Sequence, residues 1–171
     1  LTRQYIAMAA RTLGLMQTTE SGDFMLNSTY AIDGITAIEH SQSHSYQDVI
    51  ELYKQSNMGY SPTVLIINGA SVNGTHYFFK TQNPLDDPKL NRFIPKDVLA
   101  NTFRRWGGGG HKSEHNFDQL AETATKIFRA TGKVGTGSHG FDGNTNIAGL
   151  GVHWEMQALV MGGATAHEAM Q

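Results

Sequence analysis

Three side chains with metal-binding or acid–base chemistry stand directly after predicted β-strands: Glu20, His40 and His139. If those strands are parallel, their carboxyl ends meet at one edge of the sheet, which is where α/β folds place their active sites. Imidazole and carboxylate groups are ligand types suited to zinc or a related divalent ion. Such an ion polarises a carbonyl and lowers the pKa of a bound water toward neutrality.

Each of these residues also has an ordinary structural interpretation. A histidine after a strand more often satisfies a local hydrogen bond than binds a metal, and eight histidines in the chain raise the chance of coincidence. His153 and Glu155 lie in the first turn of a predicted helix. They could contact the metal ligands and orient them, or they could be a charge arrangement at a helix N-terminus.

The elements that must position these residues alternate along the chain. The predicted strands cover Leu15–Thr19, Ile35–Glu39, Tyr60–Asn68 and Lys133–Ser138. The predicted helices cover the first turns up to Leu13, Phe24–Ile32, Ser45–Ser56, Glu114–Thr131 and Val152–Met161, with Ser45 and Asp48 capping the third. Strands that alternate with helices indicate parallel βαβ units, so the fold class is α/β in a single domain.

A long insertion, residues 69–112, separates the third and fourth predicted strands. It holds three of the four prolines and the run Gly107–Gly110, and we expect two short helices in it, Pro88–Phe93 and Lys96–Arg105. The glycine run lacks the Lys-Ser/Thr pair of a phosphate-binding loop, so a hinge is the better interpretation. An insertion of this length predicts a lid over an active site.

The composition excludes several classes of protein. The chain has 171 residues, 39% of them apolar and 16% charged, with a net charge of −2, which argues against disorder and against a basic surface for nucleic acid. No apolar run approaches the roughly 18 residues of a membrane span. Cysteine is absent, which excludes disulfides and thiolate chemistry. A soluble protein of the cytoplasm or periplasm fits equally well.

Several segments resemble the amidohydrolase superfamily, in particular its imidazolonepropionase- and prolidase-like branch. Ile35-Thr-Ala-Ile-Glu-His-Ser41 is similar to the sixth-strand motif of that family, Ser61-Pro-Thr-Val-Leu65 to its seventh strand, and Lys133-Val-Gly-Thr-Gly-Ser-His139 to its eighth. Gly149-Leu-Gly-Val-His-Trp-Glu155 and Gly162-Gly-Ala-Thr-Ala-His-Glu-Ala169 are similar to the helix pair that follows. The resemblance spans nearly the whole chain.

The resemblance implies half of a TIM-type (β/α)8 barrel, strands five to eight, and a metal-dependent hydrolase of amide or peptide-like C–N bonds. It implies that His40 is a ligand of a divalent metal, for which zinc is the first choice. His139 stands where the family has a catalytic Asp, and would serve as a base or ligand. Thr18 stands where the fifth strand has a ligand His, with Glu20 close by as a substitute.

The length and the ends of the sequence favour a partial barrel, truncated at both ends. A closed barrel of this type takes about 250 residues. The chain begins at Leu1, and a capping box at Thr165–Glu168 opens a helix one turn before Gln171. We therefore expect an inactive fragment that self-associates through exposed strand edges. The alternative is a non-catalytic α/β binding or structural module that has lost metal ligands.

Overall fold

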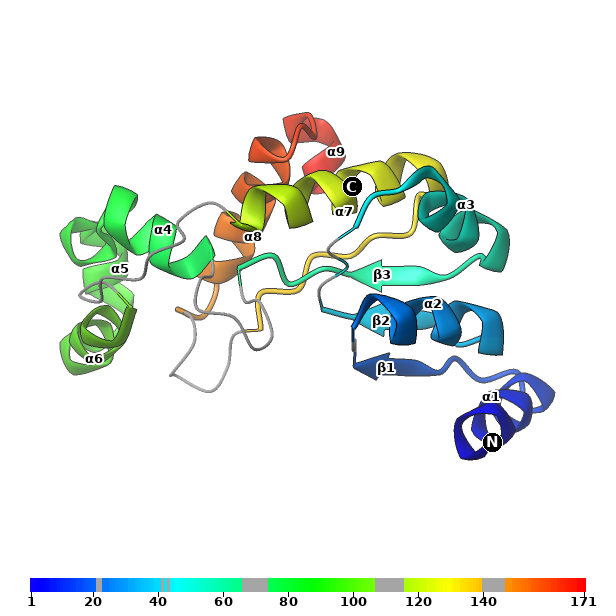
Figure 1. The fold of residues 1–171 in the computed structure, drawn as a ribbon. Coiled ribbons are helices and arrows are strands. Elements are labelled where there is room, and N and C mark those ends of the chain that lie inside the picture. The colour runs from blue at the N-terminus through cyan, green and yellow to red at the C-terminus, as the bar shows by residue number, and fades with distance from the viewer. Residues whose placement is uncertain (21–22, 41, 43, 66–73, 107–115, 140–146) are drawn as a thin grey trace.

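The computed structural model describes residues 1–20, 23–40, 42, 44–65, 74–106, 116–139 and 147–171. Over these residues the protein is a mixed α/β structure, mostly helical, with one parallel sheet of three strands in the order β1-β2-β3 (Figure 1). The strands are β1 (Thr18–Glu20), β2 (Ala37–Glu39) and β3 (Gly59–Ser61). Their register aligns Glu20 with Glu39 and Glu39 with Ser61, so the three strands end together.

The helices alternate with the strands in the first part of the chain and then follow one another. They are α1 (Thr2–Thr12), α2 (Phe24–Asp33), α3 (Gln47–Ser56), α4 (Gly74–Gln82), α5 (Pro88–Phe93), α6 (Lys96–Trp106), α7 (Asn116–Thr131), α8 (Leu150–Met161) and α9 (Ala166–Met170), with a 3-10 turn η1 (Pro84–Asp86). In the described part of the chain, no helix has both the length and the apolar character needed to cross a bilayer.

Local signals explain where several helices begin and end. The Asp23 side chain accepts a hydrogen bond from Leu26 N at 2.8 Å at the start of α2, and Gly34, with φ of 82°, ends that helix in the left-handed region. The predicted capping box of Thr165 and Glu168 is confirmed at α9. The predicted cap of α3 is wrong: its N-cap is Tyr46, without a side-chain bond.

Among the described residues, helices cover one face of the sheet, and the other face is only partly covered. Ile38 and Tyr60, at the centres of β2 and β3, are buried beneath helices, and α7 packs against β3 and α3. On the other face the flanking positions are half-buried or exposed, among them Glu20, Glu39 and Ser61. A row of polar side chains therefore lies on the uncovered side of the sheet.

The predicted strand Tyr60–Asn68 is wrong at residues 62–65, and its last part, residues 66–68, lies outside the described residues. Pro62 has no N–H for a strand ladder, and the backbone N–H groups of Val64 and Leu65 donate to the Glu155 carboxylate instead of to a neighbouring strand. The chain turns at these two residues. The β-branched residues in this segment favour a strand locally. The contact with Glu155, which comes from a distant helix, is not predicted by local propensity.

The predicted fourth strand is reduced to a single parallel bridge between Tyr60 and Val134. Two backbone hydrogen bonds of 2.9 Å hold it, one from Tyr60 N to Lys133 O and one from Gly135 N to Tyr60 O. Gly135 and Gly137 weaken the strand tendency of this segment. The structure therefore shows a three-stranded sheet and a bridged fourth segment rather than four strands of a half barrel.

The insertion contains more helix than the sequence predicted. The helices α5 and α6 are confirmed with nearly the expected bounds, but α4 was missed. Aromatic side chains join this region to α8: Phe78 stacks on Trp154 with centroids 5.5 Å apart, and Phe79 meets Trp154 edge-on at 5.1 Å. In Figure 1, helices α4, α5 and α6 form a group at the left of the view, and α4 is the one that lies next to the lower end of α8.

Candidate functional site

The structure brings Glu20, His40 and His139 together at the carboxyl ends of the sheet, from three separate segments. Glu20 Oε2 lies 2.6 Å from His40 Nε2, and the centroids of the His40 and His139 rings are 5.0 Å apart. His40 is buried, whereas the Glu20 side chain is 74% exposed. The sequence predicted this juxtaposition from the parallel strand order alone.

Thr63, which the sequence analysis did not single out, occupies the other side of the His40 ring. Its Oγ1 lies 2.6 Å from His40 Nδ1 in a buried position. An ionised carboxylate can only accept a hydrogen bond, so the contact with Glu20 assigns a proton to Nε2. In a neutral ring Nδ1 is then the acceptor, and the Thr63 hydroxyl donates to it.

Three residues of this site adopt left-handed backbone conformations that disfavour residues other than glycine. The φ angles are 71° for His40, 42° for Thr63 and 50° for His139. The strain is greatest for a β-branched residue such as Thr63, and it persists only where surrounding contacts enforce it. For His40 one such contact is the 2.7 Å hydrogen bond from its backbone N to Ser61 O.

The donor types at this site suit a divalent metal, but the arrangement is not a formed metal site. Among the described residues, no three His, Asp or Glu side chains are placed to hold one ion together. The Glu20 carboxylate instead pairs directly with the ring nitrogen of His40 that would face an ion. Because Glu20 is exposed, it can rotate away without disturbing a packed core.

Glu155, predicted to support the site, is fully buried and contacts the turn after β3. Its carboxylate accepts hydrogen bonds from Val64 N at 2.6 Å and Leu65 N at 3.1 Å. Burial raises the pKa of Glu155 to about 8, although the two backbone N–H bonds act in the opposite direction. Glu155 is therefore a tertiary connection between α8 and β3, one residue away from Thr63.

A second buried polar group beneath the site was also missed from the sequence. Gln42 Oε1 accepts from Asn27 Nδ2 at 3.0 Å and from the Tyr53 hydroxyl at 3.4 Å. Gln42 N donates to the Tyr60 hydroxyl at 2.8 Å. Burial raises the pKa of both tyrosines well above the usual range, so both stay neutral. This network fixes the chain just after His40.

The other two predicted site residues lie elsewhere. Thr18 is exposed at the start of β1, at the opposite end of that strand from Glu20. His153 is exposed on α8 and lines a hollow of about 420 Å³ with Leu90, Phe93 and Leu150. His153 and Glu155, two positions apart on one helix, thus point to different surroundings.

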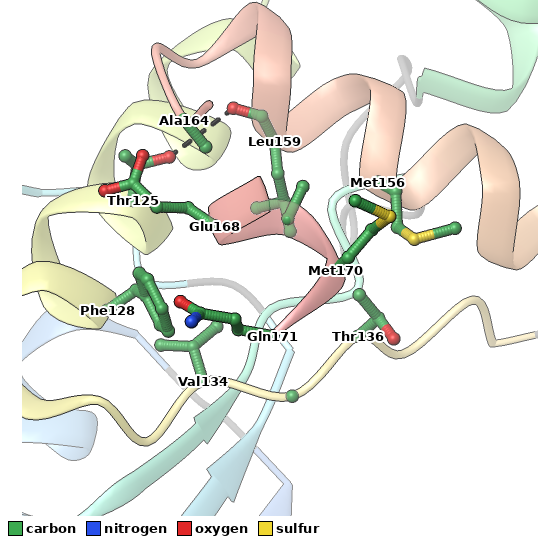
Figure 2. A pocket seen from close by; sticks show the side chains of 12 residues that line it. Thr125, Phe128, Val134, Thr136, Met156, Leu159, Ala164, Glu168, Met170 and Gln171 are labelled. Atoms are coloured by element: carbon green, nitrogen blue, oxygen red, sulfur yellow. Dashed lines mark hydrogen bonds between the residues drawn. The ribbon is translucent and has the colours of Figure 1, made fainter. Parts of the chain in front are cut away.

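Another pocket, of about 280 Å³, lies between α7, α8, α9 and the segment around Val134 (Figure 2). Met156, Met170 and Phe128 supply much of its apolar lining. The carboxylate at its rim, Glu168, is already bound by Arg129 at 2.8 and 2.9 Å. The residues predicted to do chemistry are absent from its lining.

Comparison with known proteins shows a likeness to a solved structure. No protein-family model matches the chain, and no curated protein matches it. A solved structure described as a Xaa-Pro dipeptidase with bound methionine in the active site superposes with a TM-score of 0.56 at 17% sequence identity. The match covers 98% of this chain and 34% of that chain, so this chain spans about a third of the length of its structural neighbour. The likeness is one of fold.

Proposed function

We propose that this chain carries part of the active site of a metal-dependent hydrolase that cleaves amide or peptide-like C–N bonds. The observation that carries the proposal is the meeting of Glu20, His40 and His139 at the carboxyl ends of parallel strands. The likeness of fold to a dipeptidase supports it. The segments around His40, Leu65 and His139 that resemble the amidohydrolase superfamily lie at this same edge.

In this proposal His40, Glu20 and His139 hold a divalent ion, with zinc as the first choice. Such an ion supplies Lewis-acid chemistry, polarising a substrate carbonyl and making a water a better nucleophile. His40 would hold the ion through Nε2, the nitrogen that Glu20 now contacts, and its ring proton would then lie on Nδ1, with the Thr63 hydroxyl oxygen as hydrogen-bond acceptor. His139, exposed at the edge, would serve either as a third ligand or as the base that moves protons.

We further propose that the chain forms half of a barrel that another segment or copy completes. The coverage of about a third of the neighbour and the open face of the sheet support this. On its own the chain is expected to be inactive, because a (β/α)8 site draws ligands from several strands. The insertion is expected to act as a lid.

Zinc binding tests the proposal more directly than turnover. Calorimetry of the 171-residue chain should show one zinc site, which His40→Gln abolishes and Glu20→Gln weakens at least tenfold. His153→Gln, on the same side of α8 as the hollow near Phe93, is the control and should bind as the wild type does. Turnover of dipeptides or N-acyl amino acids by the chain with zinc would contradict the expected inactivity.

The second candidate is a non-catalytic α/β module that lost its metal ligands. The observation in its favour is the Glu20–His40 pair itself, which satisfies both side chains without an ion. This candidate predicts no zinc binding at any concentration and no change in thermal stability on adding zinc. Binding would instead raise stability in proportion to the logarithm of the zinc concentration.

A further inference from the structure

Glu155 is a buried acidic residue whose role the proposed metal chemistry leaves unexplained. It comes from α8, far in sequence from Val64 and Leu65, whose N–H groups it accepts. Each of its two oxygens accepts one backbone N–H hydrogen bond, so the carboxyl group holds two successive peptide units in place. The carbonyl on the other side of Leu65 is held as well, because Leu65 O accepts from Thr75 N at 3.3 Å.

Thr63 comes directly before the two residues bound by Glu155, and its backbone has a strained left-handed conformation. A β-branched residue leaves this region readily unless the flanking peptides are fixed. Glu155 fixes the peptides on the C-terminal side of Thr63. The Thr63 hydroxyl is thereby held 2.6 Å from His40 Nδ1.

We propose that Glu155 is a positioning residue for His40, which acts by holding the turn at residues 63–65 so that the Thr63 hydroxyl fixes the orientation of the His40 ring and, together with Glu20, its tautomer. The inference rests on the proposed function only in taking His40 to be a metal ligand. The path itself runs through four contacts: Glu155 to Val64, Glu155 to Leu65, Thr63 to His40, and His40 to Glu20.

A purely structural role for Glu155 makes a different prediction. If the carboxyl group only joined α8 to the sheet, its loss would lower stability and leave the His40 ring unchanged. Any other substitution in α8 that lowers the unfolding free energy by a similar amount would then have the same effect on the His40 ring. Leu159, which is 6% exposed and lines the pocket of Figure 2 rather than the turn, provides that comparison.

The test reads the ring nitrogens of His40 by 15N NMR in the full 171-residue chain without metal. The pH is about 8.5, above the ordinary imidazole pKa of about 6.5, and His40→Gln identifies the signals. The wild type should show one tautomer, protonated at Nε2. Glu155→Gln puts an amide NH2 against one of the two backbone donors, and the single tautomer should be lost. Leu159→Val should keep the wild-type ring shifts.

A double-mutant cycle decides whether Thr63 transmits the effect. Thr63→Val removes the hydroxyl, so the ring shifts should change, and adding Glu155→Gln should change them no further. Unchanged ring shifts in Glu155→Gln, with the Val64 and Leu65 amide signals displaced, would overturn the inference. So would an equal further change in the Thr63→Val background.

Two features keep this test independent of folding and of the metal proposal. If Glu155→Gln does not fold, Glu155→Asp replaces it, since the shortened carboxylate reaches only one of the two N–H groups and should also disturb the tautomer. If the chain binds no zinc but the ring shifts behave as expected, the proposed function fails and the positioning role stands. If zinc binds and Glu155→Gln leaves the ring unaffected, the positioning role fails and the proposed function stands.

Discussion

His40 shows how much of this site depends on the environment of a single ring. It has a carboxylate at one nitrogen and a hydroxyl at the other, each 2.6 Å away, and a backbone of positive φ that points it across the sheet edge. In the proposed metal site, moving the ring proton from Nε2 to Nδ1 would leave Nε2 available as a ligand and would make the Thr63 hydroxyl the acceptor at Nδ1. The arrangement of the site therefore depends on Thr63 as well as on the residues that the sequence suggested.

Gly137 is expected to control the position of the Thr63 side chain, which it contacts closely. A Cβ at Gly137 would lie 2.9 Å from Thr63 Cγ2 and 3.2 Å from Ser61 Oγ, too close without a shift. Gly137→Ala should destabilise the protein by about 1–3 kcal/mol and displace the His40 ring signals. Gly135→Ala is the matched control, since its Cβ meets only Ser61 Oγ at 3.9 Å. Equal thermal unfolding and ring shifts in the two variants would contradict the prediction.

The pH dependence of stability should carry a contribution from Glu155. Its pKa is about 8 in the folded protein, against 4.5 for an ordinary Glu, so the folded state keeps a proton that the unfolded chain releases. Between pH 4.5 and 8 the free energy of unfolding should therefore fall as the pH rises, by a few kcal/mol at most. Urea unfolding of wild type and Glu155→Gln across this range measures the slope. The prediction fails if both proteins have the same slope.

At the scale of elements, local sequence signals determine most helix bounds, whereas the bounds of the strands depend on contacts with distant residues. The helices α2, α5 and α9 begin at side-chain caps that the sequence displays. The strands have three residues each, and the ends of β3 depend on where the amides of Val64 and Leu65 find acceptors. Helix contacts also depend on small residues, as at the crossing of α7 and α8.

Gly162, the C-cap of α8, packs directly on the backbone of α7. A Cβ there would overlap the backbone of Ala121 and lie 2.5 Å from Glu122 N, which no rotamer change can relieve. Gly162→Ala should cost about 3 kcal/mol or more in unfolding free energy, measured by urea titration. Val160→Ala, at a 42% exposed position of the same helix, should cost little. Near-equal losses would show that the two helices adjust freely.

The attachment of α9 should weaken in acid. The Arg129 guanidinium, together with the backbone of Thr165, lowers the pKa of Glu168 to about 2. A lowered carboxyl pKa stabilises the folded state above the ordinary value of 4.5 and ceases to do so as the pH falls toward 2. Amide exchange in α9 should thus be faster in Glu168→Gln than in the wild type at pH 6, with the difference vanishing near pH 2. A difference that persists unchanged in acid would contradict this.

At the scale of the whole molecule, the N-terminal region has an uncovered apolar surface beside the edge of the sheet. Ala7 is the single buried residue of α1, while Tyr5, Ile6 and Leu13 are between 53% and 71% exposed. The adjacent β1 pairs with β2 alone among the described strands. Exposed apolar side chains, and a strand edge that no other described strand pairs with, are both typical of an interface.

We expect a second copy of the chain to cover this surface. The sedimentation coefficient should rise with protein concentration, and Ile6→Lys together with Leu13→Lys should shift the chain to monomers. Met170→Lys, at a 70% exposed position at the other end of the chain, should leave association unchanged. A monomer at all concentrations would exclude self-association through this surface.

The sequence by itself determined the α/β class, most of the helices and the meeting of Glu20, His40 and His139. These depend on periodicity, on capping residues and on the rule that parallel strands end at one edge. Only the tertiary structure decided the length of β3, the reduction of the 133–138 segment to a bridge, and the roles of Thr63 and Glu155. Those features depend on which distant group accepts a given backbone N–H, and residues about 90 positions apart leave no periodic signal of that contact.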